Sequence, residues 1–154
     1  YASTEGAEVT CSTDNVVYAI VGIQLKAAYI GSVVKILNAG IQLQTASETG
    51  EWLLLLNPTV AGTFTYSDVT NSALQRALGA TANTVTGGTR VGGGFGSSGG
   101  ASTGASGNLG TSLDSSRYLG ASINGTVDEI VLCWMPNGGT SGHAVEGSLT
   151  WREL

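Results

Sequence analysis

The chain has 154 residues, of which 42% are hydrophobic and only 11% charged, with 24 glycines and a net charge of −5. Six Lys and Arg against eleven Asp and Glu cannot neutralise many phosphates, which excludes a basic nucleic-acid-binding face. The longest apolar runs are far shorter than the ~20 residues of a membrane-spanning helix, and charge-rich disorder does not fit this composition. We therefore expect one domain with no nucleic-acid and no membrane partner.

Alternating or continuous apolar runs predict strands through the first half of the chain. The predicted strands cover residues 17–26, 33–37, 41–44, 51–56 and 63–66. A bend is expected at residues 38–40. Pro58 is expected to end the strand over residues 51–56, because proline cannot donate a hydrogen bond to a ladder. Residues 1–14 precede the first strong run and are predicted to be an N-terminal arm or linker.

One segment has the pattern of a helix. Residues 73–78 are predicted to form about two turns, with Asp68, Asn71 or Ser72 as the N-cap and Gly79 just past the end.

Glycine and serine dominate the middle of the chain. Gly87 and Gly88 are predicted to form a tight hairpin turn. Residues 92–110 are almost entirely Gly, Ser, Ala and Thr, which predicts a long flexible loop without a core of its own.

Strands return in the last third. They are predicted over residues 118–120, 122–123, 126–135 and 144–151. Asn124 and Gly125 are typical of a two-residue hairpin turn. About eight strands and one short helix predict an all-β fold, a single β-sandwich or jelly-roll-like domain over residues 15–154.

The candidate chemistry is sparse. Cys11 and Cys133 have no metal-ligand spacing, and a free buried thiol is favoured over a disulfide. His143 is the single histidine and reads as a solvated loop residue. The G-x-S-x-G match around Ser98 carries no weight, because a Gly/Ser tract matches any glycine pattern. We predict no catalytic residue, no cofactor and no metal; a hydrolase would need Ser98 or a carboxylate pair beside His143.

The aromatic residues divide into core and surface candidates. Trp52 and Trp134 adjoin aliphatic runs and are expected in the core. Phe95, Tyr118 and Trp151 are the predicted interaction surface.

The shortage of charge is the most informative property. A free monomer needs charged side chains to stay soluble, whereas the centres of protein interfaces are depleted in charge. The composition therefore favours a molecule that is buried against copies of itself or docked on a larger assembly.

Four segments support this interpretation by resemblance. Residues 55–66 (LLNPTVAGTFTY), 71–74 (NSAL), 82–89 (ANTVTGGT) and 147–153 (GSLTWRE) resemble segments of virion structural proteins of tailed bacteriophages. The resemblance covers roughly residues 15 to 154 and rests on strand and turn sequences, so it brings no site residue with it.

The resemblance implies a non-enzymatic virion component. The favoured form is a capsid decoration or cement protein, present as a trimer or in more copies and bound to a major capsid or tail protein. The alternative is a tail or head fibre domain that binds a host receptor or glycan.

Overall fold

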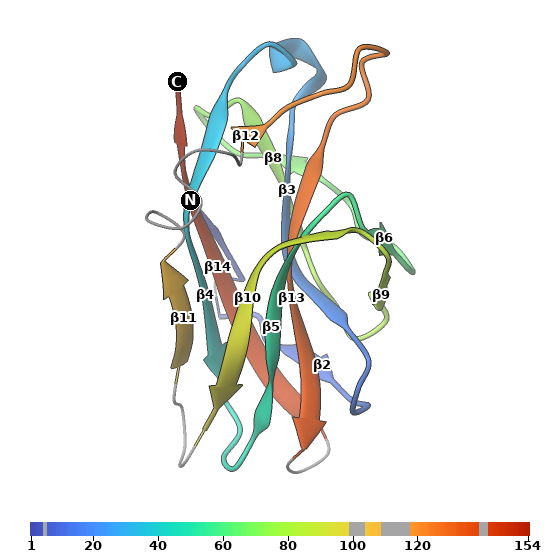
Figure 1. Ribbon diagram of the computed structural model, residues 1–154, viewed down its shortest axis with the longest axis vertical. Helices are drawn as coiled ribbons and strands as arrows, with labels where there is room; N and C mark the ends of the chain where they lie inside the picture. Colours follow the sequence, from blue (N-terminus) through green and yellow to red (C-terminus); the bar gives the residue numbers. More distant parts are fainter. Residues whose placement is uncertain (5, 99–103, 109–117, 139–141) are drawn as a thin grey trace.

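The computed structural model of the chain describes residues 1–4, 6–98, 104–108, 118–138 and 142–154. These residues form two six-stranded antiparallel sheets that pack against each other, with a separate two-stranded pair beside them (Figure 1). The prediction of an all-β sandwich is confirmed. No helix in the described part is long and apolar enough to cross a membrane.

The first sheet, sheet A, has the order β1–β14–β4–β11, with β2 also on β14 and β12 also on β4. Its strands are β1 (Ala2–Ser3), β2 (Val9–Cys11), β4 (Val34–Leu43), β11 (Gly104–Asn108), β12 (Tyr118–Leu119) and β14 (His143–Glu153). The segment 1–14, expected as an arm or linker, thus supplies two strands, and Ala2, Val9 and Cys11 are buried in the core. Burial of these apolar side chains makes the segment part of the folded domain.

The second sheet, sheet B, has the order β10–β5–β13–β3–β8–β7. Its strands are β3 (Tyr18–Leu25), β5 (Thr49–Leu56), β7 (Ser67–Asp68), β8 (Leu74–Leu78), β10 (Thr89–Ser97) and β13 (Glu129–Gly138). A single turn of 3-10 helix, η1 (Ala27–Tyr29), follows β3.

The main core lies between the two sheets. Side chains alternate along each strand, so Ile130, Leu132 and Trp134 of β13 point inward together. From sheet A, Leu43 and Leu149 pack into the same cluster. Trp134 is fully buried, as expected from its apolar neighbours.

The outer face of sheet B is also partly buried. Val131 and Cys133 point away from the main core, and they form a second cluster with Val85 and Phe64. The cover comes from β6 (Thr59–Val60) and β9 (Val85–Thr86), which pair with each other. This explains why the strands in the middle of sheet B are continuous apolar runs rather than alternating ones.

The predicted helix over residues 73–78 is wrong. Leu74–Leu78 is strand β8, and it pairs with β3 from Leu25↔Leu74 to Val21↔Leu78. An isolated helix of two turns is unstable in water, whereas the exposed edge of β3 offers a complete ladder. Tertiary pairing therefore overrides the local helix propensity.

The flexible loop predicted over residues 92–110 is not confirmed. Residues 92–97 belong to β10 and pair with β5, residues 104–108 form β11 on β4, and residues 99–103 and 109–110 lie outside the described residues. Glycine-rich segments can form these strands because ladder hydrogen bonds use only backbone groups. At Gly94 a side chain would not fit, because a Cβ there would lie 2.9 Å from the indole Nε1 of Trp52.

Three turn predictions also change. The expected bend at 38–40 is absent, because β4 runs unbroken from Val34 to Leu43. Gly87 and Gly88 do have positive φ, but the strands on either side pair with different partners and form no hairpin. At Asn124 and Gly125 a turn is present, with positive φ at Gly125 alone.

A substitution at Gly22 can test how tightly the outer face of sheet B is packed. A Cβ at this position would lie 2.7 Å from the Tyr66 hydroxyl and 2.8 Å from the Phe64 ring. We expect Gly22→Ala to lower the free energy of unfolding by about 1–3 kcal/mol through overpacking. Urea denaturation measures this. The control is Gly31→Ala, where a Cβ meets no atom within 4 Å; equal effects of the two substitutions would contradict the packing.

Candidate functional site

A groove lies at the end of the sandwich where β3 and β14 finish. We call it the end groove; its volume is about 550 Å³. It is lined by Lys26, Tyr29, Ser32, Asn71, Ser72, Ala73, Glu153 and Leu154. Two loops, 26–33 and 69–73, form its sides, which is typical of binding sites carried on a β scaffold.

Backbone hydrogen bonds fix the two loops. The Lys26 N–H donates to the Ala73 carbonyl at 2.9 Å, and the Leu154 N–H donates to the Val33 carbonyl at 2.9 Å. The Tyr29 and Ser32 amides continue the turn by donating to carbonyls three residues earlier. The groove is therefore formed by hydrogen-bonded backbone on both sides.

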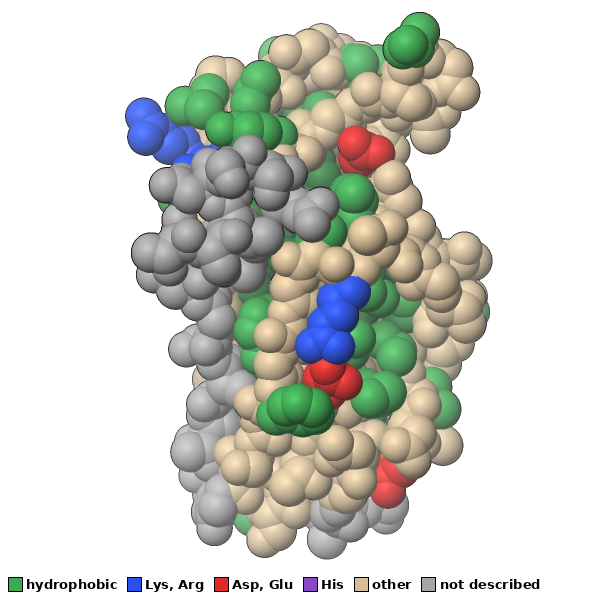
Figure 2. All heavy atoms as spheres, in the orientation of Figure 1, with side chains coloured by type: hydrophobic (Ala, Val, Ile, Leu, Met, Phe, Trp, Pro, Cys, Tyr) green, Lys and Arg blue, Asp and Glu red, His purple; other side chains and the backbone are tan. Residues whose placement is uncertain are grey.

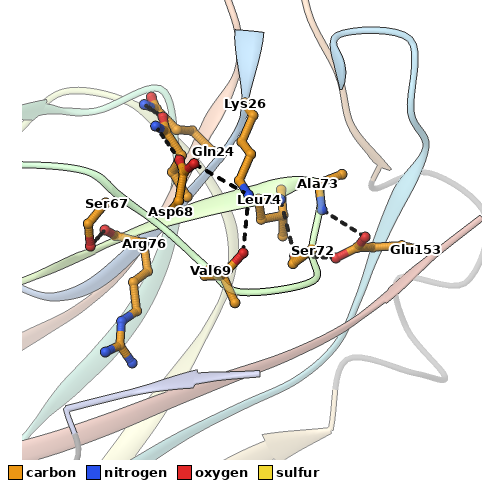
Figure 3. Close-up of polar contacts among 11 residues, drawn as sticks. Gln24, Lys26, Ser67, Asp68, Val69, Ser72, Ala73, Leu74, Arg76 and Glu153 are labelled. Atoms are coloured by element: carbon orange, nitrogen blue, oxygen red, sulfur yellow. Dashed lines mark hydrogen bonds and ion pairs between the residues drawn. The ribbon is translucent and has the colours of Figure 1, made fainter. Parts of the chain in front are cut away.

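Glu153 forms the polar centre of the groove (Figure 3). The Ala73 N–H donates to Oε2 at 2.9 Å, and the Trp151 Nε1–H donates to Oε1 at 2.9 Å. The Ser72 hydroxyl also donates to Oε1. Because Glu153 belongs to sheet A and Ser72 precedes β8 of sheet B, these bonds join the two sheets at this end.

The same contacts shift the ionisation of Glu153. Partial burial raises the pKa of the carboxyl, but hydrogen bonds from Ser72, the Ala73 amide and Trp151 outweigh it, so that the net pKa is lowered. Glu153 is therefore held as a carboxylate, an acceptor fixed by three donors.

Lys26 lies on the other side of the same loop (Figure 3). Its Nζ donates to the Val69 carbonyl at 3.1 Å and lies 3.6 Å from Asp68 Oδ2. Asp68 in turn accepts a hydrogen bond from Gln75 at 2.9 Å. The groove thus contains a cation whose position is set by two partners.

Three lining side chains are not engaged. Within the described residues, the side chains of Tyr29, Ser32 and Asn71 make no hydrogen bond. Tyr29 is 50% exposed. Asn71 has φ of 56°, a left-handed conformation in which asparagine is tolerated. Within the described part of the chain, a ligand at these three side chains would have no hydrogen bond to displace.

The opposite end of β14 holds a buried histidine and a buried glutamate side by side. His143 is 1% exposed and Glu48 is 0% exposed. His143 Nδ1 lies 2.8 Å from Glu48 Oε2, and Nε2 lies 3.3 Å from Asp14 Oδ1. The expectation of a solvated histidine is wrong, because a buried polar side chain needs a polar partner and the strand register brings His143 to Glu48.

Ser98 is not brought to His143, whereas two carboxyl groups, those of Asp14 and Glu48, do lie beside the histidine. The Ser98 hydroxyl donates to the Thr45 carbonyl at 2.6 Å and accepts the Glu48 amide at 2.9 Å, and both nitrogens of His143 face carboxylates. The described contacts therefore assemble no Ser98–His143 pair of the kind that activates a nucleophile.

The two cysteines are free and buried. Burial, with a smaller contribution from the Glu48 charge, raises the pKa of Cys11 to about 12. Burial also raises the pKa of Cys133. Such thiols are unreactive, and within the described ranges no group of three or more His, Cys, Asp and Glu side chains is placed to hold a metal ion.

The predicted interaction residues do not form one surface. Phe95 lies on β10 of sheet B and is 78% exposed. Tyr118 lies on β12 at the opposite sheet, in register with Lys35, and is about half exposed. Trp151 is half-buried against the main core and donates to Glu153, so it belongs to the end groove's support rather than to a surface.

The end groove was not found from the sequence, although one signal was present. Asn71 and Ser72 were interpreted as helix caps, and the Ser72 hydroxyl does accept the Leu74 N–H at 3.1 Å. The same local hydrogen bond forms in turns, so the signal marked a loop that starts a strand. Nothing in the sequence indicates that Glu153 reaches this loop from 80 residues away.

Comparison with known proteins gives no relative: no protein-family model matches the chain, and neither a curated protein nor a solved structure is detectably similar to it.

The buried pair predicts a specific stability pattern. His143→Ala leaves the buried Glu48 side chain without its polar partner, and we expect the free energy of unfolding to fall by about 1–3 kcal/mol. The double substitution Glu48→Leu with His143→Leu removes both polar groups and should be less destabilising than the single one. Urea denaturation at neutral pH measures both. Asp14→Asn, which changes the exposed partner of His143, serves as the control. A double variant with a lower free energy of unfolding than His143→Ala would contradict the pairing.

Glu153 predicts a pH dependence. Its folded pKa is lowered, so its contribution to stability is present above the unfolded value of about 4.3 and is lost as pH falls through the folded value. Glu153→Gln should therefore be less stable than wild type at neutral pH, with the difference shrinking in acid. Thermal unfolding across pH tests this. The control is Glu146→Gln on the same strand; a difference for Glu153→Gln that does not change with pH would refute the prediction.

Proposed function

We propose that the chain is a non-enzymatic structural component of a phage virion, a multi-copy capsid decoration protein that acts through contacts between subunits and with the shell. The observation that carries the proposal is the scarcity of charge, 11% of residues, on a domain that leaves large apolar side chains exposed. Interfaces are depleted in charge at their centres, and such a surface is poorly suited to a free monomer.

One face supports the proposal in particular. On sheet B, Phe95 of β10 is in register with Glu51 of β5, which is in register with Met135 of β13. Beside this row, Leu53 is only partly buried. We call this the β10–β5–β13 face; these strands lie toward the viewer in Figure 1.

Few charges interrupt this face. Figure 2 shows the molecule from the same side, with scattered blue and red side chains and green hydrophobic ones reaching the surface between them. Glu51 is paired with Arg90, whose side chain lies over Gly93. A neutralised pair and an exposed aromatic ring suit a contact surface, because aromatic residues and arginine are enriched in interfaces.

The second candidate is a tail or head fibre domain that binds a host receptor or glycan. The end groove favours it, because its lining includes an exposed tyrosine together with Ser32 and Asn71, whose side chains make no hydrogen bond to another described residue. Both candidates are contact functions and share the multi-copy arrangement.

The test of the contact face is self-association. We expect the purified chain to sediment as an oligomer at high protein concentration and low salt, and Phe95→Asp to shift it toward monomer by placing a charge in the interface. The matched control is Ile123→Asp, at an apolar residue on a turn that is even more exposed than Phe95. A wild-type monomer under these conditions would overturn the proposal, and dissociation by Ile123→Asp alone would place the contact elsewhere.

The virion assignment has its own test. Quantitative mass spectrometry of purified phage particles should find the chain in many copies alongside a major capsid or tail protein. A chain found only in the soluble fraction of infected cells would contradict this assignment without touching the self-association result.

A further inference from the structure

We infer that the end groove is a binding site for a neutral glycan of one or two sugar units. A groove of about 550 Å³ on hydrogen-bonded loops has the size of a small-ligand site, and its lining of one exposed aromatic ring and several polar groups is more polar than most such sites. The inference rests on this groove alone and holds whether or not the chain is a decoration protein.

The polar groups match the hydroxyls of a sugar. Each sugar hydroxyl both donates and accepts hydrogen bonds, so its site needs both kinds of partner. Glu153 is an acceptor held in place by Ser72 and the Ala73 amide, and Lys26 is a donor held by the Val69 carbonyl. Fixed partners lose little entropy on binding.

Adaptable groups surround these fixed ones. Ser32 and Asn71 line the groove and make no side-chain hydrogen bond to another described residue. The amide of Asn71 offers two donors and an acceptor, and the Ser32 hydroxyl offers both. Donors and acceptors on both sides of the groove can therefore contact neighbouring hydroxyls.

The Tyr29 ring supplies the apolar part. Sugars present C–H groups on the faces of the ring, and these are buried favourably against a flat aromatic surface. Tyr29 is 50% exposed and lines the groove, and its hydroxyl makes no hydrogen bond to another described residue. The groove therefore combines an aromatic ring, Tyr29, with the polar side chains of Glu153 and Asn71.

The charges favour a neutral ligand. The chain carries a net charge of −5, and Glu153 adds a fixed negative charge inside the groove. Lys26 is already close to Asp68. An anionic sugar would therefore meet repulsion without a free cation to offset it.

The sheet face provides an internal comparison. A second groove of about 560 Å³ lies over Gly40, Gln42, Glu146 and Ser148. It is similar in size and polarity, yet its only aromatic residue is Tyr1, at the rim. A glycan that needs both a ring and fixed polar partners should prefer the end groove.

The experiment is ligand-observed saturation-transfer NMR on the full chain, which works for a monomer or an oligomer. The probes are the methyl glycosides of glucose, galactose, mannose and N-acetylglucosamine, with lactose, maltose and sialic acid. We expect at least one neutral sugar to bind. Tyr29→Ala should weaken that binding about tenfold, the effect of losing roughly 1.4 kcal/mol of ring contact.

Matched variants separate the groove from general damage. Asn71→Gly removes the amide but keeps a residue that adopts positive φ, so it should weaken binding without unfolding the chain. Gln42→Ala in the second groove and Phe95→Ala on the β10–β5–β13 face should leave binding unchanged. Absence of binding by every neutral sugar, binding by sialic acid alone, or binding that survives both Tyr29→Ala and Asn71→Gly would each overturn the inference. Self-association, measured separately, is unaffected by these outcomes.

Discussion

The fold depends on the need to cover sheet B on both faces. Strands β3, β5 and β13 are continuous apolar runs, so burying only the inner face would leave half of their side chains in water. Sheet A covers the inner face, and the excursion through β6 and β9 covers part of the outer one. Asn83 holds this excursion by donating to the carbonyls of Ala61 and Thr63. The cover ends before the row of Phe95 and Met135, which is why the chain still has an apolar face to offer.

Polar contacts at the two ends of β14 fix the register of this strand, which apolar packing alone does not do. At one end His143 meets the buried Glu48, and at the other Glu153 reaches across to Ser72 beside β8. Hydrophobic burial is non-directional, whereas these contacts work only in one register. The first is enclosed and serves the fold. The second lines the end groove, so the contact that joins the sheets also fixes the acceptor on which the glycan proposal depends.

The sequence predicts the strong elements of the fold and fails where partners come from far away. The runs at 17–26 and 128–135 match β3 and β13 closely, because period and continuity are local properties. Strand β8 was mistaken for a helix since its pairing with β3 cannot be seen locally. Of the candidate site, only the turn at Asn71 and Ser72 left a signal. The burial of Glu48 and His143, and the reach of Glu153, follow from sheet topology that no short window contains.

The two surfaces proposed for contact and for ligand lie apart. Phe95 faces the start of β5, whereas the end groove lies where β3 and β14 finish, at the other end of the sandwich (Figure 1). An assembly through the β10–β5–β13 face would therefore leave every groove open. A single groove with a few polar contacts binds a sugar weakly, but copies held in one array raise the overall affinity by about 10²–10⁴ without any new contact. The two proposals are therefore compatible in one molecule, because the proposed assembly would supply the overall affinity that a single groove would lack.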